Sequence, residues 1–324
     1  MELGREILYL SDAEIAAADM SKRELAEAVD DMLKQKATGR TVSKPKLGLY
    51  PKPGTFFQAM SGVMEEPPFA GVKWASVVHD NAERGLPSIS PIIQLHDTES
   101  AQPVALMGGR WITAHRTAAI TLVAATYLAR PESESIGFIA CGVQARSHLE
   151  AFRQVFPLKR VVAYSRKRAT AEAFANEVAE SGLDVVVTED PMKAVEGQDI
   201  VITSVPESPS LKPFLDSNWV SPGSFAGMCD VARPWHGDRI RVLDLVATDD
   251  HDQSAYMAKS GRLHFKEPFD ADLAELAGGK KPGRTSDEQR TGLIYSGLAL
   301  ADVAVAGRLY RRAIENGWGT ILPL

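Results

Sequence analysis

The chain has 324 residues, more than one hydrophobic core usually supports, so we expect two domains. Hydrophobic residues make up 44% and charged residues 24%, which excludes a disordered chain, and a formal charge of −6 leaves no basic surplus for nucleic acid. The seven histidines and two cysteines show no metal-ligand spacing. The low cysteine content, the absence of a signal-peptide pattern and the absence of a run of roughly 20 apolar residues predict a cytoplasmic protein without metal, nucleic-acid or membrane partners.

The N-terminal part predicts two helices and then a small sheet. Residues 11–36 contain two Ser-x-x-Glu capping boxes, with Ser11 before Glu14 and Ser21 before Glu24. Residues 44–97 hold short apolar runs punctuated by proline and glycine, which are typical of strands. Residues 117–129 are apolar on all sides and too long for a strand, so we expect a buried helix there.

From residue 135 onward strands alternate with helices. Strands are expected at 135–140, 160–165, 184–188, 199–205, 224–230 and 242–250, and helices at 143–156, 168–182 and 190–197. This alternation, with continuously apolar strands, predicts an α/β fold with a Rossmann doubly wound parallel sheet. Residues 298–317 form an amphipathic pattern that predicts a long C-terminal helix.

The turn after the first of these strands is a candidate dinucleotide site. It reads Ala140-Cys141-Gly142-Val143-Gln144-Ala145, where the usual fingerprint is G-x-G-x-x-G or G-x-G-x-x-A. Gly142 keeps the position that approaches the pyrophosphate, and Ala145 is an accepted small residue at the third position. Ala140 replaces the first glycine. A plain strand–turn–helix remains the alternative, but we predict a cofactor site at Gly142, Val143, Gln144 and Ala145.

The end of the second strand bears on which cofactor is used. An acid there would bind the ribose hydroxyls of NAD, whereas an arginine accommodates the extra phosphate of NADP. The chain has Ser165 and Arg166 at this point, followed by two further cations, and no acid. The charges favour NADP, but the same residues can also be a solvated start of the next helix. The choice between NAD and NADP therefore stays open.

Four stretches together resemble the ornithine cyclodeaminase/mu-crystallin family. They are residues 71–89, 106–129, 137–152 and 283–306, and they follow the family's order and spacing. The resemblance implies an NAD- or NADP-dependent enzyme that acts on a small amino acid or its imine, and a homodimer. It also implies a smaller α+β domain for substrate binding and dimerisation at 1–116, completed by the helix at 303–324, and a Rossmann dinucleotide-binding domain at 117–302.

The resemblance also carries functional roles to individual positions. The family's catalytic lysine matches Lys73, its carboxylate-binding arginine matches Arg116, and its acid/base aspartate matches Asp230. A second substrate arginine of the family is replaced by Lys46. Beside Arg116 we expect His115 to contact the substrate and Thr117 to contact the cofactor. Other matching positions cannot be divided into packing and contact residues; they are Met60, Asn81, Thr113 and Asp302.

The loop after Asp230 departs from the cyclodeaminase pattern. It reads Asp-Val-Ala-Arg-Pro-Trp-His-Gly-Asp and lacks the glutamate that a substrate with a distal ammonium requires. It offers Arg233 and His236 instead, although a solvent-facing loop is an equally good interpretation. With Lys46, Lys73 and Arg116, these residues suggest more positive charge than one carboxylate needs. We therefore expect an imine reductase that prefers iminosuccinate, giving aspartate. The alternatives are an ornithine-type cyclodeaminase and a non-catalytic crystallin-like binding protein.

Overall fold

The computed structural model describes residues 1–208 and 210–324. The chain divides into two compact units, which are described separately below. Unit 1 comprises Met1–Arg116 and Leu298–Leu324, and unit 2 comprises Thr117–Gly297. None of the helices in the described ranges is long and apolar enough to cross a membrane.

Unit 1 is built on one mixed sheet, sheet A, with strand order β16-β1-β7-β6-β5-β4-β2 and with β3 paired to β4. Among the described strands of this sheet, β1 and β7 pair in parallel and the other neighbours are antiparallel. The elements of unit 1 are β1 (Glu6–Leu10), α1 (Asp12–Ala17), α2 (Lys22–Ala37), β2 (Thr41–Ser43), β3 (Leu47–Lys52), β4 (Thr55–Met64), β5 (Phe69–Val78), β6 (Ile89–Asp97), β7 (Pro103–Gly108), α8 (Ala299–Asn316) and β16 (Thr320–Pro323), with a short 3₁₀ helix at His79–Arg84.

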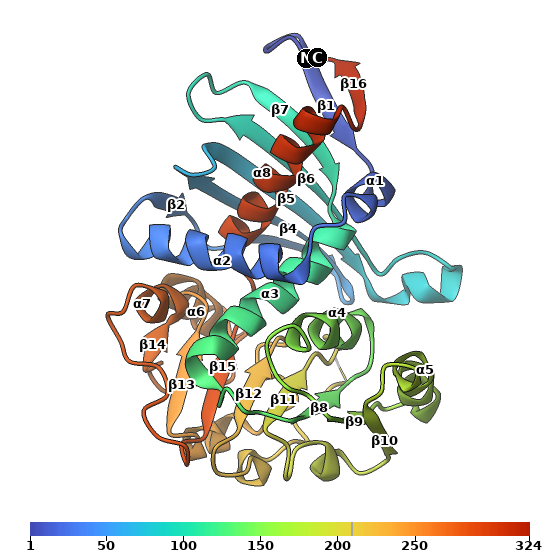
Figure 1. Ribbon diagram of the computed structural model, residues 1–324, viewed down its shortest axis with the longest axis vertical. Coiled ribbons are helices and arrows are strands. Elements are labelled where there is room, and N and C mark those ends of the chain that lie inside the picture. The colour runs from blue at the N-terminus through green and yellow to red at the C-terminus, as the bar shows by residue number, and fades with distance from the viewer. Residues whose placement is uncertain (209) are drawn as a thin grey trace. The chain divides into compact units, whose positions relative to one another are not determined.

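Helices α2 and α8 cover one face of sheet A (Figure 1). Side chains alternate between the two faces of a strand, so Met60 and Met64 of β4 and Ile93 and Leu95 of β6 are buried beneath these helices. The apolar face of α8 is almost continuously buried. Helix α8 comes from the end of the chain, so the core of unit 1 is completed only by residues 298–324.

Both predicted capping boxes are confirmed. The hydroxyl of Ser11 accepts from the backbone N–H of Glu14, and Ser21 does the same for Glu24. Helix α3 (Arg110–Leu128) begins seven residues earlier than the prediction of 117–129. Its first N–H groups donate to the carboxylate of Asp12, 2.9 Å from the N–H of Arg110, and a cap so distant in sequence leaves no local signal.

Unit 2 contains an all-parallel sheet, sheet B, with strand order β10-β9-β8-β11-β12-β15-β13-β14, and this confirms the predicted Rossmann architecture. Its elements are β8 (Ser135–Ile139), α4 (Val143–Phe152), β9 (Arg160–Tyr164), α5 (Arg168–Ala179), β10 (Asp184–Thr188), β11 (Ile200–Thr203), β12 (Phe225–Met228), β13 (Leu245–Thr248), α6 (His251–Lys259), β14 (Ala271–Asp272), α7 (Leu273–Ala277) and β15 (Thr291–Ile294). The helix expected at 190–197 is only a 3₁₀ turn at Pro191–Ala194, and α4 ends at Phe152 rather than 156.

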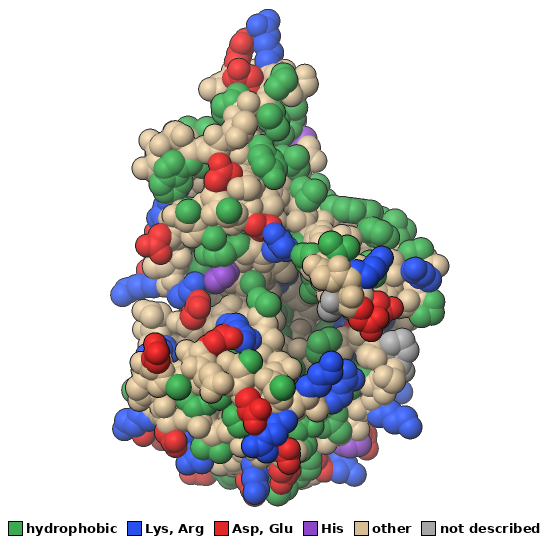
Figure 2. Space-filling model, turned by 90° about the vertical axis from the view of Figure 1, so that its right-hand side faces the viewer, with side chains coloured by type: hydrophobic (Ala, Val, Ile, Leu, Met, Phe, Trp, Pro, Cys, Tyr) green, Lys and Arg blue, Asp and Glu red, His purple; other side chains and the backbone are tan. Residues whose placement is uncertain are grey.

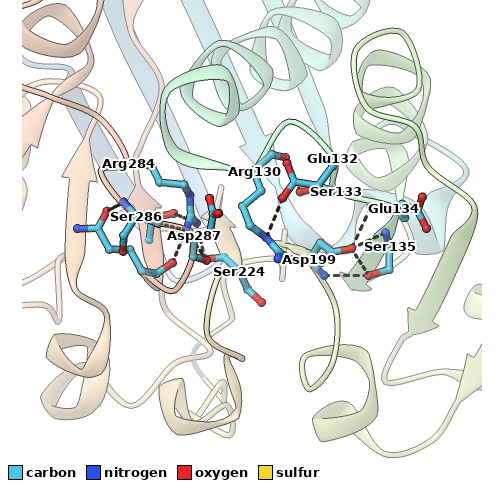
Figure 3. Close-up of polar contacts among 12 residues, drawn as sticks. Arg130, Glu132, Ser133, Glu134, Ser135, Asp199, Ser224, Arg284, Ser286 and Asp287 are labelled. Carbon is cyan, nitrogen blue, oxygen red and sulfur yellow. Dashed lines mark hydrogen bonds and ion pairs between the residues drawn. The ribbon is translucent and has the colours of Figure 1, made fainter.

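Polar side chains tie together the amino ends of the strands in sheet B (Figure 3). Asp199 accepts from the N–H groups of Glu134 and Ser135 and forms an ion pair with Arg130. Arg284 donates to several backbone carbonyls of the neighbouring segments. These contacts are structural, because ligands of open α/β sheets bind at the opposite, carboxyl edge.

Candidate active site

The turn between β8 and α4 lies at the carboxyl edge of sheet B. Gly142 is the N-cap of α4, and no side chain caps this helix end in the described structure. A Cβ at Gly142 would meet no atom within 4 Å, so the space in front of the backbone is open. The first N–H groups of α4 and the positive end of its dipole therefore suit a phosphate group. The turn fits the pyrophosphate of a dinucleotide.

Hydrogen bonds compensate for the glycine missing from this turn. Ala140 takes the left-handed conformation, with φ of +75°, which is what the first glycine of the fingerprint allows. Its N–H donates to the carbonyl of Tyr164 at 2.9 Å. Arg146 on α4 donates to the carbonyls of Cys141 and Gly142 at 2.8 and 3.0 Å. The surrounding contacts thus hold alanine in a backbone conformation that it disfavours.

The end of β9 supports this turn. The Ser165 hydroxyl accepts from the N–H of Cys141 at 2.9 Å, so this side chain holds the turn. Arg166 and Lys167 are exposed, while Arg168 pairs with Glu172 on α5. The charge of Arg168 is thus compensated within the protein.

Asp230 follows β12 at the same carboxyl edge and is buried. Its Oδ1 accepts from the hydroxyl of Thr203 at 2.9 Å, and its Oδ2 accepts from the N–H of Val205 at 2.8 Å. Burial raises the pKa of Asp230 to about 6, although these two donors and the charge of Arg233 act against the rise. A carboxyl group that titrates near neutral pH can both accept and release a proton under physiological conditions.

Arg233 forms an ion pair that was not expected from the sequence. Its Nη2 lies 2.8 Å from Oε2 of Glu207, which also lies 3.6 Å from Nη2 of Arg262. Glu207 belongs to the loop after β11, so nothing near Arg233 in the sequence indicated this partner. His236 is half-buried at the start of a 3₁₀ helix, Gly237–Val242. The positive charge expected from this loop is therefore partly neutralised.

Unit 1 contains a buried cluster of three charged side chains, Lys73 on β5, Arg116 on α3 and Asp302 on α8. Nζ of Lys73 lies 2.8 Å from both carboxylate oxygens of Asp302, and Nε of Arg116 lies 3.0 Å from Oδ1. At most 6% of each of these side chains is exposed. The structure thus brings together two of the predicted residues and adds Asp302, whose role the sequence left undecided.

The charges in this cluster do not cancel. Burial and the neighbouring Arg116 lower the pKa of Lys73 to about 8, against the opposing effect of Asp302. Burial acts to raise the pKa of Asp302, but Arg116 and Lys73 hold it below the usual range. At pH 7 the cluster therefore contains two cations and one anion. A buried charge without a counter-charge is costly, so the cluster favours binding of one further anion.

The surroundings of the remaining predicted residues do not indicate their roles. His115 is half-buried on α3 and stacks on Trp111, with the ring centroids 4.1 Å apart. Lys46 is half-buried between β2 and β3. Thr117 is buried, and its carbonyl accepts from the Tyr295 hydroxyl at 3.0 Å. The described residues contain no group of three or more His, Cys, Asp or Glu side chains that could hold a metal ion.

Comparison with known proteins identifies the family. The model of the ornithine cyclodeaminase/mu-crystallin family matches residues 6–317. The chain belongs to this family. An alanine dehydrogenase from Archaeoglobus fulgidus is 30% identical, over 97% of this chain and 98% of its own length. A Δ1-pyrroline-2-carboxylate reductase from Bacillus cereus is 32% identical, over 80% of this chain and 82% of its own length.

Several solved structures share the fold of this chain. An archaeal alanine dehydrogenase dimer with bound NAD has a TM-score of 0.86 and 29% identity, covering 98% of this chain and 99% of that one. The Thermococcus litoralis Δ1-pyrroline-2-carboxylate reductase, in complex with NADH and L-proline, has a TM-score of 0.87 and 28% identity, covering 97% and 99%. The iminosuccinate reductase of Paracoccus denitrificans has a TM-score of 0.85 over 99% and 100%, but at 21% identity it supports only the shared fold.

Proposed function

We propose that this family member is an NAD(P)H-dependent reductase that converts a small α-imino acid with one carboxylate into the L-amino acid. The single observation that carries the proposal is the buried cluster of Lys73, Arg116 and Asp302, with its net charge of one. Similarity to alanine dehydrogenase and Δ1-pyrroline-2-carboxylate reductase supports the same substrate class. When bound, the nicotinamide supplies the hydride for the imine carbon.

The cluster is assigned to the substrate carboxylate. The guanidinium of Arg116 can form parallel hydrogen bonds with a carboxylate and so fix its orientation, and the ammonium of Lys73 adds a second charge. Asp302 already offsets one of these charges at 2.8–3.0 Å. A substrate with one carboxylate would therefore neutralise the site completely.

Asp230 is assigned to the proton on the substrate nitrogen. Reduction of an imine adds a hydride, which bound NAD(P)H would supply, at the carbon and a proton at the nitrogen. A carboxyl group with a pKa of about 6 can share that proton with an imine nitrogen and stabilise the iminium that accepts hydride. In the oxidative direction, ionised Asp230 takes the proton from the amino acid.

The preference for iminosuccinate, inferred from the sequence, rested on surplus positive charge. Glu207 pairs with Arg233, and Asp302 pairs with both Lys73 and Arg116, so part of that surplus is compensated within the protein. We therefore propose a monocarboxylic imine as the substrate and keep iminosuccinate as the dicarboxylic comparison in the assay.

The cyclodeaminase alternative requires an acid for the distal ammonium of ornithine. Glu207, in the loop after β11, is such an acid, but its carboxylate is engaged by Arg233 and Arg262. The crystallin-like alternative does not require an acid/base carboxylate, whereas Asp230 has a perturbed pKa and two donors. Both observations favour the reductase.

The decisive assay follows oxidation of NADH and of NADPH by the purified protein. The substrates are pyruvate with ammonium, Δ1-pyrroline-2-carboxylate, and oxaloacetate with ammonium, and each keto acid alone is the control. We expect turnover with the first two and at least tenfold lower kcat/KM with oxaloacetate and ammonium. Asp230→Asn should abolish turnover while NADH still binds. Ammonia release from ornithine, without net cofactor consumption, would establish the cyclodeaminase instead.

We also propose a homodimer formed through unit 1. Figure 2 shows hydrophobic side chains over the surface of this unit, in the upper half of the view. Exposed apolar residues recur along its strands, and they include Val42, Leu47, Leu49, Tyr50, Val63, Trp74 and Ile92. An apolar surface of this kind marks an interaction site, and the archaeal alanine dehydrogenase is a dimer. Light scattering should give twice the chain mass of 35.1 kDa.

A further inference from the structure

The carboxylate of Asp230 stands at the end of a short series of hydrogen bonds. Nε1 of Trp235 donates to Oγ1 of Thr203 at 3.3 Å, and the same Oγ1 donates to Oδ1 of Asp230 at 2.9 Å. All three residues are buried, and Thr203 and Trp235 have no exposed surface. The strand β11, the end of β12 and the following loop therefore meet at one hydroxyl group.

The donor count determines the direction of each bond. An indole N–H can only donate, so the hydroxyl of Thr203 must accept from Trp235. Its own hydrogen is then available for one acceptor, and the carboxylate of Asp230 provides it. Val205 donates to the other oxygen at 2.8 Å. A carboxylate offers about four acceptor positions, so these donors leave room for the proton of a substrate.

The backbone after Asp230 is strained. Val231 and Ala232 have φ of +60° and +57°, a conformation that usually requires glycine or asparagine. The N–H of Arg233 donates to the carbonyl of Asp230 at 3.3 Å, so residues 230–233 form a tight turn of the type with two left-handed residues. Such strain persists only where the surrounding structure enforces it, and it concentrates at functional sites. This turn leads the chain back so that the indole of Trp235 reaches Thr203.

Other titratable groups of unit 2 lie close to Asp230 in space or in the chain. Arg233 favours the ionised carboxylate, and Glu207 offsets part of that charge. Burial raises the pKa of the adjacent Cys229 thiol to about 12. Burial also lowers the pKa of His148, which lies 3.3 Å from the Cys229 sulfur, to about 4. Cys229 and His148 are therefore neutral between pH 5 and 8, and they do not titrate in the range in which Asp230 does.

We propose that Thr203 and Trp235 are positioning residues that hold the carboxylate of Asp230 in a single orientation, ionised and ready to take the proton of the amino acid. The inference rests on the proposed function, because Asp230 is there the acid/base group. Trp235 acts through Thr203: its indole N–H prevents the hydroxyl from turning away from Oδ1. A purely structural Trp235 would fill the apolar cluster that it shares with Leu215 and Ile240 without affecting proton transfer.

The test is the pH profile of kcat/KM for oxidation of the L-amino acid. In the wild type, activity should rise with pH through about 6, the pKa of Asp230, because only the ionised carboxylate accepts a proton. Thr203→Val removes a donor that favours the ionised form of Asp230. The pH at which kcat/KM rises should therefore increase by about one unit. Trp235→Phe should also increase this pH, but by a smaller amount than Thr203→Val does. Thr203→Ser keeps the hydroxyl and should restore the wild-type profile.

Trp219→Phe is the matched control, because Trp219 packs against the same apolar cluster and has no hydrogen bond to Thr203. This variant should not change the pH at which kcat/KM rises. If Thr203→Val and Trp235→Phe lowered kcat/KM equally at every pH, without changing the pH at which it rises, the inference would be overturned. The carboxyl ¹³C signal of Asp230, identified by its loss in Asp230→Asn, gives the same titration without substrate. An unshifted signal in both variants overturns the inference, whereas absence of turnover with every imine contradicts the proposed function alone.

Discussion

Replacing Asp302 with asparagine tests the charge balance of the buried cluster. The substitution keeps the size of the side chain but removes the one anion that lies within 3.0 Å of both Lys73 and Arg116. Two buried cations would then remain without compensation. Removing one partner from a buried ion pair typically costs about 3–5 kcal/mol, because the remaining charge is desolvated and unpaired.

This cost can be converted into a change in Tm. Unit 1 has 143 residues, and at about 2.1 cal/mol/K per residue its unfolding entropy is roughly 0.3 kcal/mol/K. The Tm of Asp302→Asn should therefore fall by about 10–17 °C if unit 1 unfolds alone. If all 324 residues unfold together, the larger entropy reduces the expected fall to about 4–7 °C.

Calorimetry at pH 7 with and without added anions measures both the loss and its cause. Malonate and acetate should each raise the Tm of Asp302→Asn more than that of the wild type, because the variant cluster carries one more uncompensated positive charge. Glu27→Gln is the control. It removes one carboxylate from an exposed ion pair on α2, which is worth only about 0.3–0.5 kcal/mol.

Two results would refute the reasoning. If Asp302→Asn lowered the Tm no more than Glu27→Gln does, Asp302 would not compensate the buried cations. If malonate and acetate stabilised wild type and variant alike, the cluster would not be the anion site, and the assignment of the substrate carboxylate would fail with it.

The remaining predictions concern three single positions. The KM of a monocarboxylic substrate should increase as the pH is raised beyond 8. Lys73, with a pKa of about 8, then loses its proton, and the cluster loses its net positive charge. A KM that is constant from pH 7 to 9 would contradict this. Ala140→Gly should raise the free energy of unfolding by about 0.5–1 kcal/mol in denaturant titration, since glycine relieves the left-handed strain but costs some entropy. Arg166→Ala should raise the KM of NADPH by about tenfold and leave that of NADH within about twofold, as expected if the exposed guanidinium binds the 2′-phosphate; equal changes for both cofactors would exclude that role.

The sequence was most informative where the relevant signals are local. Capping boxes at Ser11 and Ser21, and the alternation of apolar strands and helices after residue 135, depend on neighbours within a few positions, and the structure confirms them. The start of α3 was misplaced because its cap, Asp12, lies 98 residues away from Arg110. Short strands such as β1 and β16 carry too few residues for their own periodicity to be recognised.

The charge state of the site could not be predicted in the same way. Asp302 lies 229 residues from Lys73 in the sequence, and only the packing of α8 against β5 brings the two together. Glu207 likewise pairs with Arg233 across two loops of unit 2. Counting cations along the sequence therefore overestimated the positive charge, because the compensating carboxylates come from other elements. Thr203 and Trp235 carry no motif at all, and only their hydrogen bonds identify them.

Unit 1 is formed by segments from both ends of the chain, and this affects its folding during synthesis on the ribosome. At about 5–20 residues per second, the 181 residues of unit 2 take roughly 10–35 s to emerge, and for that time sheet A has neither α8 nor β16. The nascent N-terminal segment must keep Lys73 and Arg116 hydrated until Asp302 arrives, while unit 2 can already fold. Truncated products that end before residue 298 should therefore contain a folded unit 2 and an N-terminal segment that depends on chaperones. Unit 1 can fold completely only after the last 27 residues have been synthesised.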